Sequence, residues 1–244
     1  MAGQNLGGRV ALVTGGSRGI GAAVATALAD AGAAVAVNYR ERAEEANQVV
    51  AAVTARGGRA IAVAADVSQG AAVKAMVAQI TNHLGPIDIL VNNAGIAIVR
   101  GVDELTEDDF DRTILVNLKS AFLCTQAVVP SMRARKWGRI VNITSGAARG
   151  AGAIGPHYNA SKAGMEGLTR GYAARLVKDG ITVNSVAPSL IETDMMRGRT
   201  DLARNIPLGR MGQAAEVAQA VTMVLGNDYM TGQTIVLNGG MSFI

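Results

Sequence analysis

Short apolar runs alternate with helix-forming segments along the whole of this chain. The first run, residues 9–14, is rich in β-branched residues and stops at glycines, and an Ala-rich helical segment follows to about residue 31. Strands that alternate with helices form a parallel sheet covered on both faces. We therefore predict one α/β domain over residues 1–244, with a doubly wound parallel sheet of about seven strands. The expected strands are 9–14, 34–39, 59–65, 87–92, 139–144, 182–187 and 233–237.

Composition narrows the classes of function. The net charge of +4 is spread among scattered basic residues with no interleaved aromatics, which argues against nucleic-acid binding. No apolar run reaches the roughly 18 residues of a membrane span. Cys124 is the only cysteine, so a reducing, cytoplasmic setting is expected. Two distant histidines, His83 and His157, predict no metal site.

A glycine-rich turn joins the first predicted strand to the first predicted helix. This arrangement sets backbone N–H groups and a helix N-terminus against a phosphate. The spacing is Gly-x-x-x-Gly-x-Gly, which differs from both Gly-x-Gly-x-x-Gly and the P-loop. We predict dinucleotide binding here, through Gly15, Ser17, Arg18, Gly19, Ile20 and Gly21.

The end of the second predicted strand bears on which dinucleotide is bound. An acidic residue there would suit the ribose hydroxyls of NAD, and an arginine would suit the 2′-phosphate of NADP. No acid ends the run 34–39, and Arg40 follows it. Arg18 and Arg40 could converge on one phosphate. NADP(H) is thus the expected cofactor, the alternative being that Arg40 and Arg42 only decorate the next helix.

Tyr158 and Lys162 stand four residues apart in a helix-forming segment. Residues i and i+4 share one helix face. A neighbouring positive charge lowers the phenol pKa from its usual value of roughly 10. The pair could then handle a proton near neutral pH. Taken alone, such a pair is more often a solvated helix face.

Residues that follow the predicted strands should meet at one edge of the sheet. Ligands of open α/β sheets bind beyond the carboxyl ends of the strands. The glycine loop, Asp66, the segment 92–95, Ser145 and Pro188 all follow strands, so they predict one shared site. Ser68, just after Asp66, is expected to cap the next helix.

These motifs together resemble the short-chain dehydrogenase/reductase family, of compact single-domain Rossmann-like type, over essentially the whole chain. The motifs are Thr14-Gly15-x-x-x-Gly19-x-Gly21, Asp66, Asn92-Asn93-Ala94-Gly95, Asn117, Ser145, Tyr158-x-x-x-Lys162, and Pro188 with Thr193. Within the family, the ranges 180–188, 191–195 and 238–241 are most similar to bacterial 3-oxoacyl-[acyl-carrier-protein] reductases.

The resemblance implies a catalytic tetrad of Asn117, Ser145, Tyr158 and Lys162. Ser145 would bind the substrate carbonyl and Tyr158 would deliver the proton. Lys162 would lower the phenol pKa and bind the nicotinamide ribose, and Asn117 would hold a water for proton resupply. Further cofactor contacts implied are Asp66, Val67, Asn93, Ala94, Gly95, Pro188, Ile191 and Thr193.

The resemblance also implies a ketone or 3-oxoacyl substrate, possibly on acyl carrier protein, and a homotetramer formed through the long helices and the C-terminal strand. Two features depart from the family pattern. Ser189 stands where glycine is usual, and Asp179 stands where a base is common. Reduction of small ketones therefore stays an alternative. So do a silent nucleotide-sensing regulator and a structural subunit.

Two smaller expectations concern the surroundings of the site. The segment 191–206 is expected to form a mobile lid, in which Met195 and Met196 could meet an apolar substrate tail. An irregular surface loop is the alternative interpretation. His157, beside Tyr158, is a candidate substrate contact.

Overall fold

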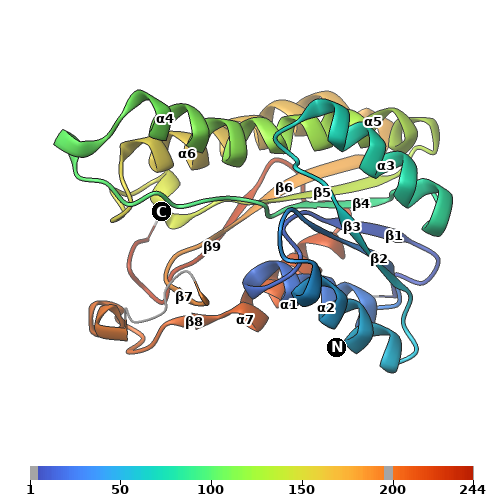
Figure 1. The fold of residues 1–244 in the computed structure, drawn as a ribbon, viewed down its shortest axis with the longest axis horizontal. Coiled ribbons are helices and arrows are strands. Elements are labelled where there is room, and N and C mark those ends of the chain that lie inside the picture. Colours follow the sequence, from blue (N-terminus) through green and yellow to red (C-terminus); the bar gives the residue numbers. More distant parts are fainter. Residues whose placement is uncertain (1–4, 195–199, 244) are drawn as a thin grey trace.

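The computed structural model describes residues 5–194 and 200–243, and its centre is a parallel sheet of seven strands. The strand order is β3-β2-β1-β4-β5-β6-β9 (Figure 1). This confirms the predicted doubly wound sheet, with boundaries that shift by one or two residues. The strands are β1 (Val10–Val13), β2 (Ala34–Tyr39), β3 (Ala60–Ala64), β4 (Ile89–Asn92), β5 (Gly138–Ile143), β6 (Ile181–Pro188) and β9 (Thr234–Leu237).

Helices cover both faces of this sheet (Figure 1). One face carries α3 (Gly70–Leu84), α4 (Glu107–Thr113), α5 (Ser120–Ala134) and α6 (Pro156–Leu176), and the other carries α1 (Gly19–Asp30), α2 (Ala43–Ala55) and α7 (Ala214–Leu225). Alternate strand residues feed two separate apolar cores. Ala11 and Val13 pack in the core with α1 and α7, whereas Val10 and Leu12 pack in the core with α3 and α5. Burial on both faces explains the continuous apolar runs in the sequence.

The long helical segment that begins after Thr106 is not a uniform α-helix. Thr106 caps α4, because its hydroxyl accepts a hydrogen bond of 3.1 Å from the Asp109 amide. Between α4 and α5 lies a π-helical segment, Ile114–Lys119. Such segments are rare and occur mostly at functional sites. Neither its presence nor its place is predicted by the apolar periodicity.

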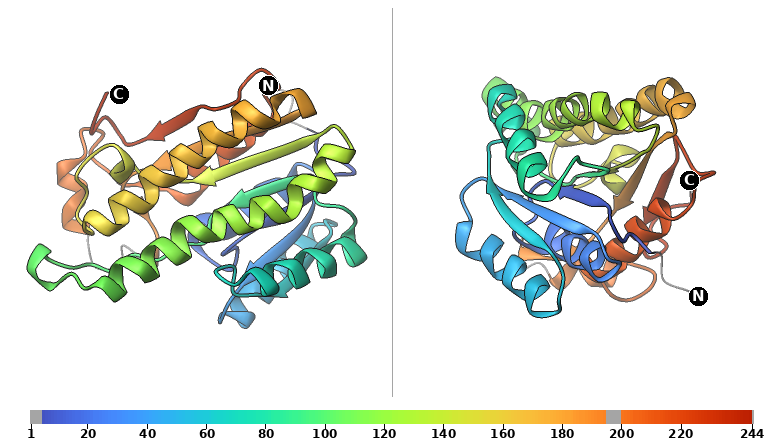
Figure 2. Two further views of the ribbon diagram at one scale, coloured as in Figure 1. Left: turned by 90° about the horizontal axis from the view of Figure 1, so that it is seen from above. Right: turned by 90° about the vertical axis from the view of Figure 1, so that its right-hand side faces the viewer.

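By length and composition alone, Glu107–Ala134 is the one helix of the described chain that could cross a membrane. Its most apolar window is 44% buried inside the fold. The segment runs over the sheet beside α6 (Figure 2). Core helices of soluble proteins pass the same test.

A second, two-stranded sheet lies beyond the carboxyl edge. It pairs β7 (Ile191–Glu192) with β8 (Gly212–Gln213), and strands this short leave no pattern in the sequence. The segment predicted as a lid, 191–206, thus begins with the strand β7, and its C-terminal part contains a 3-10 helix, Thr200–Asn205. Met195 and Met196, named as lid residues, lie outside the described residues. Shorter 3-10 helices occur at Val102–Glu104, Gly146–Ala148 and Val177–Asp179.

One local prediction, the capping of α3 by Ser68, is wrong. The N-cap of α3 is Gln69, and no side chain caps the helix. The reason is that Ser68 is already bound. The Asp66 carboxylate accepts hydrogen bonds from the Ser68 amide at 2.9 Å and from the Ser68 hydroxyl at 2.7 Å.

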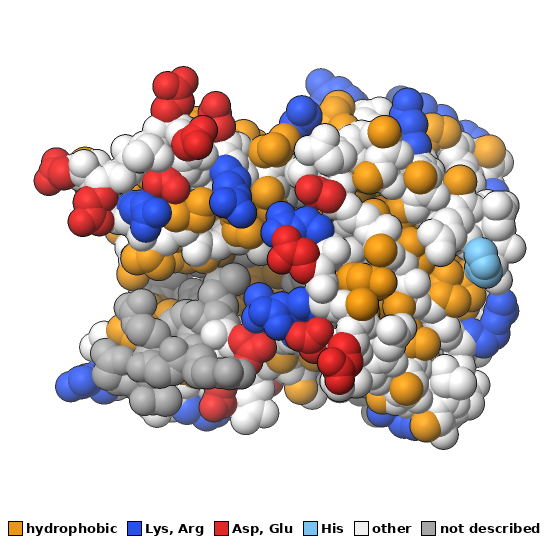
Figure 3. Space-filling view, in the orientation of Figure 1, with side chains coloured by type: hydrophobic (Ala, Val, Ile, Leu, Met, Phe, Trp, Pro, Cys, Tyr) orange, Lys and Arg blue, Asp and Glu red, His pale blue; other side chains and the backbone are white. Residues whose placement is uncertain are grey.

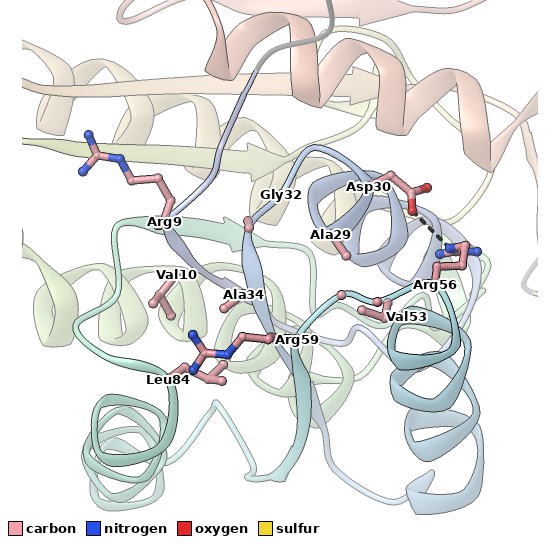
Figure 4. A pocket seen from close by; sticks show the side chains of 14 residues that line it. Arg9, Val10, Ala29, Asp30, Gly32, Ala34, Val53, Arg56, Arg59 and Leu84 are labelled. Atoms are coloured by element: carbon pink, nitrogen blue, oxygen red, sulfur yellow. Dashed lines mark ion pairs between the residues drawn. The ribbon is translucent and has the colours of Figure 1, made fainter.

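The amino edge of the sheet carries a pocket of about 410 Å³ (Figure 4). Arg9, Arg56 and Arg59 line it together with several glycines. In the close view the three guanidinium groups point in different directions, and Arg56 turns to Asp30 at 3.1 Å. None of the residues predicted for coenzyme or substrate lines this pocket.

Candidate active site

The glycine loop has the shape that phosphate binding needs. Gly15 and Gly19 both have positive φ, of 60° and 53°, which favours glycine. A Cβ atom on Gly21 would lie 2.3 Å from the Gly15 carbonyl oxygen, so no side chain fits there. Arg18 is the N-cap of α1 and makes no side-chain cap. The first-turn N–H groups of α1 therefore have no capping side chain and can bind an anion.

Two polar side chains join the glycine loop to the segment after β4. The Thr14 hydroxyl accepts hydrogen bonds of 3.0 Å from the amides of Asn93 and Ala94. In return, the Asn93 side-chain amide donates to the carbonyl oxygens of Thr14 and Gly15, both at 3.0 Å. The predicted cofactor residues Gly15, Asn93 and Ala94 thus form one continuous wall.

Asn38 supports the same wall and was missed in the sequence. It is 2% exposed, and its carbonyl oxygen accepts from the Gly15 amide at 3.2 Å. Its amide donates to the carbonyl oxygens of Val63 and Ala65 at 3.3 and 3.1 Å. A single asparagine directly after the apolar run 34–37, inside the predicted strand 34–39, was the available signal.

The arginines expected to hold a 2′-phosphate lie at this edge, each beside an acid. Arg18 pairs with Asp194 at 3.4 Å and Arg40 pairs with Glu41. Both arginine side chains are nearly half exposed, at 46% and 44%, so a phosphate could replace these acids. Of the other predicted cofactor residues, Val67 is buried.

Thr193 brings the segment after β7 against the glycine loop. A Cβ atom on Gly19 would meet the Thr193 methyl at 3.4 Å. Ile191 is 6% exposed, and Pro188 is the last residue of β6. The side chains named for the nicotinamide end of the coenzyme therefore lie at the same edge as the loop named for its phosphates.

Tyr158 lies in the first turn of α6, which begins at Pro156, a residue suited to the first helical position. Ser145 follows β5, and its side-chain oxygen accepts a hydrogen bond from the Ala147 amide at 3.2 Å, capping a 3-10 turn. Burial raises the pKa of Tyr158, and the nearby Ser145 hydroxyl opposes that shift. The two hydroxyl groups therefore lie near each other at the carboxyl edge.

Lys162 is on the same face of α6 and is only 4% exposed. Its ammonium donates to the Ile143 carbonyl oxygen at 2.9 Å and lies 5.8 Å from the centre of the Tyr158 ring. Burial lowers the pKa of Lys162 to about 8. The expected lowering of the Tyr158 pKa by Lys162 is not found here, since burial dominates and the ammonium turns to the backbone.

Asn117 lies in the π-helical segment and is fully buried. Its carbonyl oxygen accepts from the Ile96 amide at 2.8 Å, and its amide donates to the Ile96 carbonyl oxygen and the Ser161 hydroxyl, both at 3.1 Å. Asn117 therefore ties the segment after β4 to α6. Its side-chain atoms already have protein partners, so a water held by this side chain would have to share them.

His157 is buried and does not reach the open edge. Its exposure is 0%, and its Nε2 atom lies 2.9 Å from the Ile98 carbonyl oxygen. The interpretation of His157 as a substrate contact is therefore wrong. The residue anchors the start of α6 to the segment after β4.

A row of buried polar side chains lies under the site and was also missed. The Asn92 amide donates to the Asn142 carbonyl oxygen at 2.8 Å, and the Asn142 amide donates to the Thr169 hydroxyl at 2.8 Å. The Thr169 and Ser185 hydroxyls are 2.6 Å apart. The row links β4, β5 and β6 to α6, so it fixes the helix that carries Tyr158 and Lys162.

The surface is hollowed at the carboxyl edge, beneath the acidic side chains at the start of α4 (Figure 3). Among residues 5–194 and 200–243, no group of three or more His, Cys, Asp or Glu could hold a metal ion. The arrangement instead offers a glycine cradle for a dinucleotide, two neighbouring hydroxyl groups and one buried ammonium.

Comparison with known proteins gives consistent matches. The family profile described as short chain dehydrogenase matches residues 9–203. The 3-oxoacyl-[acyl-carrier-protein] reductase of Staphylococcus epidermidis is 41% identical over 240 residues, covering 95% of this chain and 98% of that protein. The (2S)-[(R)-hydroxy(phenyl)methyl]succinyl-CoA dehydrogenase subunit BbsD of Thauera aromatica is 42% identical over 241 residues, covering 96% of each.

Among solved structures, a blue fluorescent protein from a metagenomic library, in complex with NADPH, superposes with a TM-score of 0.91. It is 40% identical, and the match covers 98% of this chain and all of that one.

Proposed function

The chain belongs to the short chain dehydrogenase family of oxidoreductases, and within it we propose an NADPH-dependent carbonyl reductase whose preferred substrate is a 3-oxoacyl thioester. The observation that carries the proposal is that the Ser145 and Tyr158 hydroxyls lie near each other, beside the buried Lys162 and at the same edge as the glycine loop. Both relatives named above act, by their names, on thioesters.

In the proposed reaction the substrate ketone binds between the Ser145 and Tyr158 hydroxyls. Each hydroxyl donates a hydrogen bond to the carbonyl oxygen, and these bonds strengthen as negative charge develops on it. Tyr158 then gives its phenolic proton to that oxygen. Because burial raises its pKa, Tyr158 is a protonated donor at neutral pH. The product is a secondary alcohol.

Lys162 supplies the positive charge of the site. With a pKa of about 8, it is mostly protonated at pH 7, and its charge favours the tyrosinate left after proton transfer. Asn117 positions the site by joining Ile96 to Ser161 on α6.

The glycine cradle and the arginines fit NADPH, which when bound supplies the hydride. Gly15, Ser17, Gly19, Ile20 and Gly21 would face its phosphates at the start of α1. Arg18 and Arg40 would hold the 2′-phosphate, and Asp66, Val67 and Asn93–Gly95 would line the adenosine side. Tyr158, Lys162, Pro188, Ile191 and Thr193 would surround the nicotinamide ribose and ring.

Charges near the C-terminal end of α5 bear on the carrier of the thioester. Asp179 accepts hydrogen bonds from Arg133 at 2.6 Å and from Lys136 at 3.1 Å, and these two cations hold its pKa below the usual range. The positive charge that could attract an acidic carrier protein is therefore partly neutralised. We propose that small thioesters, including those of coenzyme A, are turned over as well as carrier-bound ones.

A substrate panel tests the proposal. NADPH oxidation is followed by absorbance with acetoacetyl-CoA, acetoacetyl-acyl carrier protein and simple ketones, at equal concentrations. We expect kcat/KM for the thioesters to exceed that for simple ketones. A preference for simple ketones would favour the small-ketone alternative. Tight NADPH binding with no carbonyl turned over would favour a silent regulator.

The cofactor is tested by Arg40→Asp, with Arg42→Asp as the matched control. Arg42 is the nearby arginine that pairs with Glu45 at 2.7 Å. Loss of a charge-assisted contact to the 2′-phosphate should raise the Kd for NADPH by roughly 10- to 100-fold. The Kd for NADH should change little, and Arg42→Asp should change neither. Equal weakening of both coenzymes by Arg40→Asp would contradict the assignment.

We also propose a cytoplasmic homotetramer. A Cβ atom on Gly167 would meet nothing within 4 Å, so the outer face of α6 is open to close helix contact. Multi-angle light scattering tests the assembly, and a monomer mass would contradict the proposed tetramer.

A further inference from the structure

Ser189 lies just past the carboxyl end of β6, next to the strand that leads to Ser145. The last paired residues of β5 and β6 are Ile143 and Val186. Beyond this pair, the Thr144 amide donates a hydrogen bond to the Val186 carbonyl oxygen at 2.8 Å. On the other side of β6, the Ser189 amide donates to the Leu237 carbonyl oxygen of β9 at 2.9 Å. Ser145 and Ser189 therefore leave neighbouring strands at almost the same level.

The Ser189 side chain turns toward Gly146, the residue directly after Ser145. A Cβ atom placed on Gly146 would come 2.2 Å from the Ser189 hydroxyl oxygen. The hydroxyl thus fills the space over Gly146, on the wall of the site that Ser145 belongs to. Any side chain at position 146 would displace it.

This hydroxyl makes no hydrogen bond with the part of the chain that the structure describes. Ser189 is half-buried, so its oxygen keeps access to a ligand. Nearby serines differ in this respect. Ser161 donates to the Tyr158 carbonyl oxygen at 2.8 Å, and Ser185 is bound to Thr169 at 2.6 Å. A hydroxyl with an unused donor beside a candidate site can bind a ligand acceptor.

The chemistry of the proposed substrate supplies such an acceptor. In a 3-oxoacyl thioester a second carbonyl stands two bonds from the ketone, and its oxygen lies a few ångströms from the ketone oxygen. Neighbouring strands are about 4.8 Å apart, which is a comparable span. One oxygen can therefore sit at Ser145 while the other faces the strand end at Ser189.

We propose that the Ser189 hydroxyl donates a hydrogen bond to the thioester carbonyl oxygen of the 3-oxo substrate, while Ser145 and Tyr158 hold the ketone. This inference rests on the proposed function and names the group that selects 1,3-dicarbonyl substrates over simple ketones. A site that hydrogen-bonds a substrate group discriminates against analogues that lack it.

The test compares Ser189→Ala, Ser189→Gly and Ser189→Thr with the wild type on two substrates, acetoacetyl-CoA and a simple methyl ketone. Loss of one neutral hydrogen bond should lower kcat/KM for acetoacetyl-CoA by about 3- to 10-fold in the Ala and Gly variants. The simple ketone should change by less than about twofold, because it has no second carbonyl. Ser189→Thr keeps a hydroxyl and should keep the wild-type ratio between the two substrates.

The Kd for NADPH, measured by fluorescence titration, separates the substrate from the nicotinamide carboxamide as the acceptor. Unchanged NADPH binding with the selective loss supports the proposal. Equal losses on both substrates, or weaker NADPH binding in Ser189→Ala, would overturn it. If the wild-type enzyme reduces simple ketones but not acetoacetyl-CoA, the proposed function itself is wrong. If the wild-type enzyme reduces acetoacetyl-CoA and the variants lose kcat/KM equally on both substrates, only the role of Ser189 is wrong.

Discussion

The two ends of the sheet treat buried charge in opposite ways. At the amino end, Asp88 accepts a hydrogen bond from the Val10 amide at 3.0 Å and pairs with Arg135 at 3.2 Å and Arg9 at 3.5 Å. Arg139 is buried and pairs with Asp228 at 2.5 Å. At the carboxyl end, Lys162 is equally buried but forms no ion pair with any described residue.

The indole of Trp137 also stabilises the positive charges at the amino end. The Arg9 guanidinium lies 3.7 Å from the centre of its ring, and the Arg139 guanidinium lies 4.4 Å from it. Buried charges are normally paired, because desolvation is costly. Charge at the amino end is therefore arranged for stability, whereas the single ammonium at the carboxyl end is left available to a ligand.

The largest expected effect is on the carboxyl end. Tyr158→Phe removes the proposed proton donor and should lower kcat by about 10³-fold or more, the upper range for general acid catalysis. Isothermal titration should show that NADPH affinity falls by at most about 10-fold, because no more than one hydrogen bond to the coenzyme is lost. Substantial residual turnover would show that another group delivers the proton.

Lys162→Met tests whether the buried ammonium costs stability. The pKa of Lys162 is lowered from 10.5 to about 8 in the folded protein, so the unfolded chain binds the proton more tightly. Wild-type stability should therefore rise with pH between about 8 and 10.5 and be lowest, on this account, below pH 8.

The methionine variant should then be the more stable protein at pH 7, by up to about 3 kcal/mol, although it loses most of its activity. Its advantage should shrink as the pH rises toward 10. Urea unfolding at a series of pH values measures this difference. A pH-independent difference between the two proteins would contradict it.

Asp88→Asn should give the reverse pattern at the amino end. It removes the negative charge that Arg135 contacts, and because the Arg135 side chain is 29% exposed, the lost charge-assisted hydrogen bond should cost about 2 kcal/mol. Urea unfolding at pH 7 should show this loss, while kcat and KM stay unchanged. A matching loss of activity at a temperature where the variant is folded would show that the two ends are coupled.

The smallest expected effect belongs to Arg9→Met. Arg9 is 37% exposed and its pair with Asp88 is long, at 3.5 Å. Loss of the stacking on Trp137 and of this weak pair should cost about 1 kcal/mol. The loss should be smaller in high salt, and the thermal midpoint at two salt concentrations measures it.

The fold could be predicted from the sequence because the strands are buried on both faces and therefore appear as continuous apolar runs. The glycine turn, Asn93, Ser145, Tyr158 and Lys162 could be brought to one edge because the carboxyl ends of parallel strands share it. The cap of α4 at Thr106 is equally local, because Thr106 and Asp109 lie three residues apart.

Features that depend on tertiary contacts could not be predicted. The burial of His157 against Ile98 depends on how α6 docks against the segment after β4. The turning of Lys162 toward Ile143 depends on how α6 docks against β5. Ser68 does not cap α3 because its hydroxyl donates a hydrogen bond to the Asp66 carboxylate instead. The second sheet pairs only two residues on each side, too few for any periodicity.

The π-helical segment Ile114–Lys119 has a consequence for how the chain tolerates changes of length. A helix turns about 100° per residue, and a π turn accommodates one more residue than an α turn. Deletion of one residue in 114–119 should restore a regular α-helix and leave α4 and α5 nearly in phase, because the π turn holds one residue more than the α turn that replaces it. What changes is the side chain presented inside the turn, where Asn117 bonds to Ile96 and Ser161. Single-residue deletions here should therefore disturb the site more than the packing of α4 and α5.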